Sequence, residues 1–399
     1  MVARGWRAAG QRGSAPPRIV LDGLPLQVQS AGIAVYTGAL VRALAAQHPE
    51  VEFGLFGLRW PLARDDSAAA SASFPPNVRW LPSLVYPLVA GAPIMRMPRL
   101  LSAEAALGPA ALYHATNYAA PRTRRTPLVV TVHDLALLRF PELGTPGLRQ
   151  LIARVPRTVH AAQRVIADSH ATAQDLRELL GVPAQRIRVV HLGCDERFQP
   201  VPDSPARQAV LARYGIAPPY LLHVGTIEPR KNLPLLVRAC ARLRDQRGAP
   251  LRLVLVGHRG WGYDALQRAL AAEGARVRVD ILGRIAAADL PAVYSAAELL
   301  AYPSLYEGFG LPVLEAMACG TPVVTSAAGS LAEIAGDAAR YVDPRDPDAL
   351  AAVLAEVLGD TAQRRILSER GRARAARFSW ERCARETFAV YEELVPFTR

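Results

Sequence analysis

The segment YLLHVGTIEPRKN, residues 220–232, decides the fold class of this chain. A mostly apolar run at 220–224 leads into a loop that starts at Gly225, and a helix-patterned stretch follows at 233–243. A strand, a loop and a helix in this order are the repeating unit of a parallel sheet covered by helices. The C-terminal end of such a strand is where α/β proteins bind phosphate groups. The segment therefore predicts a phosphate-binding loop.

This loop contains Lys231, the single lysine among 47 lysines and arginines. An ammonium is a compact donor to a phosphate oxygen, and the neighbouring Arg230 guanidinium can donate to two oxygens at once. We interpret the pair as a site for a diphosphate. The alternative is that Lys231 is a solvated residue of a surface turn, as most lysines are.

The same alternation of apolar runs and helix patterns extends along the whole chain. In the first half we expect helices at 33–46, 147–163 and 171–180, and strands at 19–21, 51–56, 78–81, 112–114, 128–133, 165–168 and 187–191. A polar, proline-rich stretch at 198–205 is typical of a linker. Beyond it we expect strands at 220–224, 251–256, 277–282, 299–302, 322–326 and 340–343. This pattern predicts an α/β protein with two Rossmann-like domains that face each other across a cleft.

The strongest local signal is PSLYEGFGLPVLEAMACG at 303–320. Gly308 and Gly310 allow a tight turn after a buried strand, and the helix that follows would direct free N–H groups and its positive dipole end at one spot. Glu307 precedes the glycines, and Glu315 is expected in the first helical turn. Carboxylates beside a phosphate site should bind hydroxyl groups, because they would repel the phosphates. The combination describes a sugar nucleotide, with Glu315 on the ribose and Glu307 on the donor sugar.

Composition limits the other functions of the chain. Its net charge of +12 could indicate nucleic-acid binding, but no zinc-finger spacing or aromatic-basic RNA motif accompanies the arginines. The four cysteines are far apart and form no C-x-x-C pair, which predicts neither a disulfide framework nor a zinc site. The apolar stretch at 81–101 is interrupted by four prolines and by Arg96, so we expect no membrane span there, although contact with a membrane surface stays open.

Glu307 and Glu315 are separated by seven residues, and this spacing resembles the signature of the family 4 glycosyltransferases, retaining enzymes of the GT-B fold. The resemblance extends to the early glycine loop at 30–37, the strand that ends at His133, the loop at 228–232 and the TPVVT segment at 321–325. In motif the chain is most similar to bacterial mannosyltransferases of O-antigen and exopolysaccharide synthesis. It departs from many relatives at Thr226, where they carry arginine, and at Ala34, where a second glycine is common.

The resemblance implies a division of the chain and a set of site residues. We expect a flexible tail at 1–17, an acceptor-side domain at 18–199 joined by a C-terminal helix at about 380–399, and a nucleotide-sugar-binding domain at 200–379. The implied catalytic residues are His133, Glu307, Arg230 and Lys231. The implied donor-binding residues are Gly32, Gly225, Thr226, Arg230, Lys231, Glu307, Gly308, Phe309, Gly310, Leu311 and Glu315.

The resemblance implies transfer of a hexose, with mannose from GDP-mannose as the preferred donor, onto a lipid-linked or saccharide acceptor of cell-surface polysaccharide synthesis. We expect a cytoplasmic protein with no cofactor, no metal requirement and no nucleic-acid partner, and peripheral contact with the inner face of the cytoplasmic membrane stays open. The alternatives are a UDP-sugar-dependent glucosyl or N-acetylglucosaminyl transferase of the same fold and a non-catalytic nucleotide-sugar binder.

Two further motifs suggest other functions, and the sequence argues against both. A nicotinamide oxidoreductase would need G-x-G-x-x-G after its first strand, and the glycines at 257–262 have the wrong spacing. Asp346 and Asp348 resemble the D-x-D metal motif of other glycosyltransferases, but Pro347 between them indicates a helix start that Asp346 caps.

Overall fold

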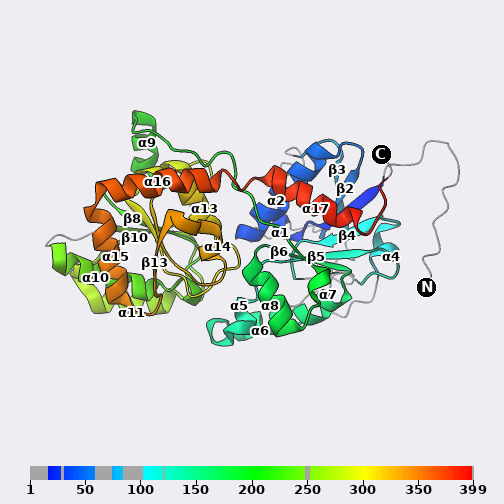
Figure 1. Cartoon of the computed structure of the whole chain (residues 1–399), viewed down its shortest axis with the longest axis horizontal. Helices are drawn as coiled ribbons and strands as arrows, with labels where there is room; N and C mark the ends of the chain where they lie inside the picture. Colours follow the sequence, from blue (N-terminus) through cyan, green and yellow to red (C-terminus); the bar gives the residue numbers. More distant parts are fainter. Residues whose placement is uncertain are drawn as a thin grey trace.

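The structure, a computed structural model, describes residues 17–27, 31–58, 74–83, 102–118, 120, 122–247 and 252–397. Figure 1 shows two lobes, each a twisted sheet flanked by helices, with the chain passing between them twice. The predicted stretch at 84–101 and the tail at 1–16 lie outside the described residues. Among the helices within these ranges, none has the length and hydropathy needed to cross a bilayer.

The first lobe is built on a seven-stranded parallel sheet in the order β3-β2-β1-β4-β5-β6-β7. The strands are β1 (Arg18–Asp22), β2 (Glu52–Leu58), β3 (Val78–Ser83), β4 (Leu112–Ala115), β5 (Leu128–Val132), β6 (Arg164–Ala167) and β7 (Ile187–Val189). The helices are α1 (Leu24–Gln27), α2 (Ala31–Gln47), α4 (Ala103–Leu107), α5 (Ala136–Arg139), α6 (Pro146–Ile152), α7 (Val155–Ala161) and α8 (His170–Leu180), with 3₁₀ turns η2 (Pro141–Leu143) and η3 (Ala184–Arg186).

The second lobe is built on a six-stranded parallel sheet in the order β10-β9-β8-β11-β12-β13. The strands are β8 (Leu221–Val224), β9 (Arg252–Val256), β10 (Arg278–Gly283), β11 (Leu299–Tyr302), β12 (Val323–Ser326) and β13 (Ala339–Val342). The helices are α9 (Pro205–Arg213), α10 (Leu233–Arg247), α11 (Tyr263–Glu273), α12 (Leu290–Ala296), α13 (Leu311–Ala318), α14 (Leu331–Ala335), α15 (Pro347–Gly359) and α16 (Thr361–Ala375), with 3₁₀ turns η4 (Pro229–Lys231), η5 (Gly274–Arg276) and η6 (Gly336–Ala338). The helix that follows α16 in sequence, α17 (Trp380–Glu392), belongs to the first lobe.

Every strand expected from the apolar runs is present within one or two residues of its predicted ends, and the predicted α/β class is confirmed. The single helix expected at 147–163 is wrong, because the chain forms two helices there, α6 and α7. Pro156 is the cause. It lacks an N–H group, and its ring would clash with the carbonyl of Ile152, the residue at which α6 ends.

The two faces of the seven-stranded sheet are covered by different helices (Figure 1). In β1, Ile19 and Leu21 face a core shared with α2, whereas Val20 faces the core shared with α7 and α8, as expected when side chains alternate along a strand. Both faces are apolar, which is what a parallel strand needs when helices cover it on both sides.

The last helix, α17, leaves the second lobe and packs against α2 of the first lobe (Figure 1). The Phe388 ring of α17 stacks on His48 with a centroid distance of 3.5 Å. The Tyr391 hydroxyl is bonded to Nδ1 of the buried His114 at 2.6 Å, and Nε2 of His114 meets the Thr131 hydroxyl at 2.8 Å. Burial lowers the pKa of His114 to about 3, so the ring is neutral. The buried His114 of the first sheet thus has one of its hydrogen-bond partners in α17.

The Tyr391→Phe variant should be less stable than the wild type by about 1–3 kcal/mol, because it leaves one ring nitrogen of His114 buried without its partner. Urea-induced unfolding, followed by circular dichroism, measures the difference.

Tyr263→Phe is the matched control, because the described residues provide no hydrogen bond to the Tyr263 hydroxyl. It should change stability by less than about 0.5 kcal/mol. Equal unfolding midpoints for the two variants would show that the His114 contact contributes nothing.

Candidate active site

The candidate site lies at the C-terminal ends of β8 and β11, two neighbouring strands of the second sheet. The loop after β8 and the loop after β11 are joined by a backbone hydrogen bond from Leu305 N–H to the Arg230 carbonyl at 2.8 Å. Asn232 adds a second link, since its side-chain amide donates to the carbonyls of Pro303 and Pro344. Both predicted motifs therefore form one structure at the edge where parallel sheets bind ligands.

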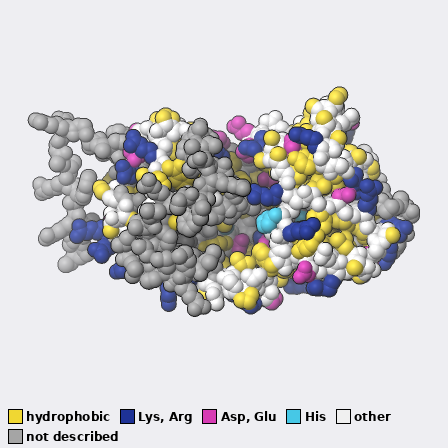
Figure 2. All heavy atoms as spheres, turned by 180° about the vertical axis from the view of Figure 1, so that it is seen from behind, with side chains coloured by type: hydrophobic (Ala, Val, Ile, Leu, Met, Phe, Trp, Pro, Cys, Tyr) yellow, Lys and Arg dark blue, Asp and Glu magenta, His cyan; other side chains and the backbone are white. Residues whose placement is uncertain are grey.

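Glu307 is the centre of a buried ion cluster in these loops. Its Oε1 accepts from Lys231 Nζ at 2.7 Å, and its Oε2 accepts from Arg230 Nη1 at 2.6 Å. Arg230 also pairs with Glu228 at 2.7 Å, and Lys231 donates to the Tyr302 hydroxyl at 2.6 Å. The formal charges of the two acids and the two bases cancel. Figure 2 shows basic, acidic and histidine side chains gathered in the hollowed middle of one face of the molecule.

The solvated-turn interpretation of Lys231 is wrong, because only 7% of this residue is exposed. Burial alone would raise the pKa of Glu307, but the charges of Arg230 and Lys231 hold it at about 2. Burial lowers the pKa of Lys231 below its ordinary value, although Glu307 opposes this change. Removal of Lys231 would leave Glu307 with a single cationic partner in a desolvated site, so its substitution is not the mild change expected for a surface residue.

The glycine loop at 308–310, between β11 and α13, is in contact with the first lobe. A Cβ atom on Gly308 would lie 1.9 Å from the His133 carbonyl oxygen, so only glycine permits this approach. The Gly308 carbonyl accepts from the Ser169 hydroxyl at 2.7 Å, and the adjacent Phe309 is buried. Gly310 has a φ of +98° and is the N-cap of α13.

Gly32, in the first turn of α2, is brought toward the start of α13, because a Cβ atom on it would lie 3.9 Å from the Leu311 side chain. Gly225 and Thr226 follow β8 directly. Gly225 N–H donates to the Val256 carbonyl, and the Thr226 hydroxyl is 3.3 Å from His258 Nδ1. Gly32 thus lies near α13, whereas Gly225 and Thr226 contact the end of β9 and the loop after it, and the contact of all three with a donor stays a prediction.

Glu315 lies one turn later than expected, because α13 begins at Leu311 and Glu315 is its fifth residue. The expectation of a first-turn acid is therefore wrong. The Tyr294 hydroxyl donates to Glu315 Oε2 at 2.7 Å. Burial raises the pKa of Glu315 to about 7, and the bond from Tyr294 only partly opposes this effect. Glu315 therefore changes charge near neutral pH.

His133 follows β5 and is bonded at both ring nitrogens. Nδ1 is 2.7 Å from Asp168 Oδ2, and Nε2 is 2.9 Å from the Thr116 carbonyl oxygen. A carbonyl only accepts, so Nε2 carries a proton, and the ionised Asp168 would require a second proton on Nδ1. Burial lowers the pKa of His133, but the charge of Asp168 and its hydrogen bond outweigh burial and raise it. The geometry favours an imidazolium.

Sequence reasoning missed Asp168 as the partner of His133. Asp168 ends the predicted strand at 165–168, and neighbouring parallel strands end at the same edge of a sheet. Its contact with His133 could therefore have been predicted from the sequence. Asp134, the acid next to His133 in sequence, has a different role, because its side chain accepts from the Ala136 N–H in the following turn.

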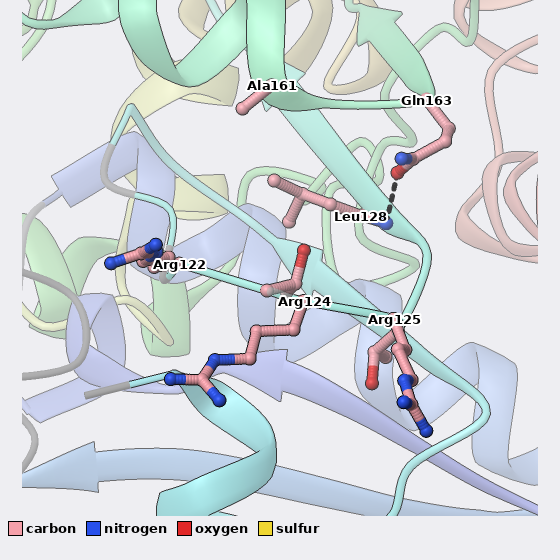
Figure 3. A pocket seen from close by; sticks show the side chains of 8 residues that line it. Arg122, Arg124, Arg125, Leu128, Ala161 and Gln163 are labelled. Atoms are coloured by element: carbon pink, nitrogen blue, oxygen red, sulfur yellow. Dashed lines mark hydrogen bonds between the residues drawn. The ribbon is translucent and has the colours of Figure 1, made fainter.

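Two other features lie apart from this site. Asp346 accepts from the N–H groups of Asp348 and Ala349 and caps α15, as predicted. A pocket of about 290 Å³ is lined by Arg122, Arg124 and Arg125 near the start of β5. Figure 3 shows these side chains with the bond from Leu128 N–H to Gln163. The pocket precedes β5, whereas the candidate site follows β8 and β11, so its basic residues do not belong to that site.

Comparison with known proteins agrees with the fold and the motifs. Residues 30–198 match the family described as Glycosyltransferase Family 4, and residues 212–374 match Glycosyl transferases group 1. The chain is 38% identical over 287 residues to the O-antigen chain mannosyltransferase B of Escherichia coli, which covers 71% of this chain and 74% of that protein. It is 33% identical over 404 residues to the D-inositol 3-phosphate glycosyltransferase of Salinispora tropica, covering 91% of this chain and 81% of that protein.

A solved structure of Anabaena Alr3699/HepE in complex with UDP and glucose superposes with a TM-score of 0.70. The match covers 94% of this chain and 99% of that chain at 22% identity, and so it concerns the fold. These matches lead to the same family as the fold and the paired glutamates. The chain belongs to glycosyltransferase family 4 and has the GT-B fold.

Proposed function

We propose that this glycosyltransferase moves mannose from GDP-mannose onto a lipid-linked or saccharide acceptor in the synthesis of a cell-surface polysaccharide. The observation that carries the proposal is the buried cluster of Glu307, Arg230 and Lys231 beside the glycine loop. The preference for mannose is supported by the 38% identity to an O-antigen mannosyltransferase.

A second candidate is a UDP-sugar-dependent transferase of the same fold. It is supported by the structural neighbour in complex with UDP and glucose and by the relative named as a D-inositol 3-phosphate glycosyltransferase. Both candidates use the same chemistry at the diphosphate and differ in the base and the sugar.

In the proposed mechanism, negative charge develops on the leaving diphosphate. Arg230, Lys231 and the N–H groups at the start of α13 stabilise this charge, because they are fixed before the reaction begins. These donors belong to the chain itself, so the proposed mechanism requires no metal ion.

Glu307 has a second task in this proposal. Its oxygens bind the two cations, and a donor diphosphate would compete for the same N–H groups. We infer that the diphosphate displaces part of this pairing, which frees Glu307 to accept a hydrogen bond from the donor sugar. His133 would contact the sugar from the first lobe. The acceptor hydroxyl attacks from the face that the diphosphate leaves, with retention of configuration, and the diphosphate takes its proton.

The donor can be identified by ligand-dependent stability. GDP-mannose should raise the unfolding temperature of the purified chain more than UDP-glucose or UDP-N-acetylglucosamine at equal concentration, because the tighter ligand stabilises the folded state by mass action. GDP and UDP alone separate the contribution of the base from that of the sugar. A larger shift with UDP-glucose would favour the second candidate.

Glu307→Gln should lower transfer by about 10- to 100-fold, because a neutral amide replaces a charged hydrogen-bond acceptor for the sugar. Its affinity for the nucleoside diphosphate should be equal or higher, because Arg230 and Lys231 lose a competing anion. Calorimetry measures the binding and a radiolabelled-sugar assay measures the transfer.

Glu228→Gln is the matched control, because Glu228 pairs with Arg230 and not with Lys231 among the contacts described. It should keep a larger share of the transfer activity than Glu307→Gln. Equal losses in the two variants would place the effect in the ion cluster as a whole and would contradict a contact between Glu307 and the sugar.

The affinity for nucleoside diphosphate should rise with pH through about 7. The raised pKa of Glu315 means that its carboxyl group is protonated below this pH and ionised above it. Only the ionised form accepts at both oxygens, so binding through the ribose should be up to about tenfold weaker at pH 6 than at pH 8.

The phosphate groups of the nucleotide also titrate near pH 6, so the wild type needs a control. Glu315→Gln provides it, because the phosphates titrate equally in both proteins. The difference between the two pH profiles isolates Glu315. Parallel profiles would remove Glu315 from the ribose site.

A further inference from the structure

A cluster of three side chains at the junction of the lobes takes no part in the proposed reaction. His170 is the first residue of α8, His191 follows β7, and Glu333 lies in α14 of the second lobe. His191 Nε2 is 2.6 Å from Glu333 Oε1, and the His170 and His191 rings are 6.0 Å apart. One ligand atom from each residue lies within 4.8 Å of the other two.

We propose that His170, His191 and Glu333 bind a transition-metal ion such as Zn²⁺, which links the two lobes. Two imidazoles and a carboxylate are a common set of three protein ligands for zinc, with a water molecule in the fourth position. Zinc ligands lie about 2.0–2.2 Å from the ion, so their atoms must be roughly 3.5 Å apart. His191 Nε2 and Glu333 Oε1 are 2.6 Å apart in a hydrogen bond, so the ion would replace this bond and move the two atoms apart. His170 is exposed at the surface, and rotation of its ring can bring in the third ligand atom.

The ligand types also select the ion. Ca²⁺ and Mg²⁺ prefer sites made of oxygen, whereas imidazole nitrogens favour zinc, copper, nickel and cobalt.

The surrounding contacts hold two of the three ligands next to each other. Both oxygens of Glu333 accept from the backbone N–H of His170, at 3.1 and 3.0 Å. The His191 ring packs against both Phe378 and Phe309, with centroid distances of 5.7 and 6.3 Å. Phe309 belongs to the glycine loop, so an ion at His191 would be one ring contact away from the candidate active site.

The three proposed ligands come from both lobes. The histidines belong to the first lobe and the glutamate to the second, so the complete set exists only while the lobes are together. An ion that binds this set stabilises this arrangement of the lobes by mass action. The site would therefore oppose separation of the lobes, while the sugar transfer would not require the ion.

Binding of Co²⁺ and Zn²⁺ to the full chain without a histidine tag tests the proposal. The visible absorption of bound Co²⁺ should appear at one ion per chain and be displaced by Zn²⁺, and Zn²⁺ should raise the unfolding temperature. His170→Ala and Glu333→Gln should each weaken binding by at least about tenfold, because even substitutions outside the first ligand shell cost that much. His170→Ala keeps the backbone bonds to Glu333, so it should fold normally.

His160→Ala is the matched control, an exposed histidine on α7 that should bind no ion and leave the affinity unchanged. Three results would each overturn the proposal. The first is that neither ion binds at micromolar concentration, and the second is that Glu333→Gln binds with wild-type affinity. The third is that His160→Ala loses as much metal affinity as the ligand variants. Wild-type affinity in Glu333→Gln would mean that the histidines alone hold the ion and that it does not link the lobes.

Discussion

The burial of Glu307 between two cations is the constraint on which the rest of the site depends. A carboxylate with so little solvent contact is ionised only because Arg230 and Lys231 compensate its charge. This compensation requires the loops after β8 and β11 to be adjacent, and the parallel pairing of the two strands makes them so. The fold thus determines the chemistry through the order of the strands, since a different neighbour of β8 would separate the charges.

The junction of the lobes is determined by backbone contacts as much as by side chains. Gly308 touches the carbonyl of His133, and Ser169 donates to the carbonyl of Gly308. His133 itself is oriented by Asp168 and Thr116 of the first lobe. A residue expected to meet the donor sugar and the loop expected to hold its diphosphate are therefore in direct contact. Movement of one lobe relative to the other would separate them.

Much of this could be read from the sequence, for physical reasons. Strands of a parallel sheet are buried on both faces, so their apolar runs are conspicuous, and all thirteen were located. The paired glutamates and the glycine loop were found because their spacing is local. The partners of Lys231 and His133 were not found, because Tyr302 and Asp168 lie on other strands and only the folded sheet brings them close. The break between α6 and α7 was missed at Pro156, a signal that was present in the sequence.

The return of α17 to the first lobe has a consequence for the synthesis of the protein. A ribosome makes the first sheet early, but Tyr391, whose hydroxyl meets His114, and Phe388, whose ring covers His48, are made only after the second sheet. Domains commonly fold in the order of their synthesis. Here the half that is translated first must wait for the whole of the second half before its own packing is complete, so a truncated chain would leave α2 uncovered.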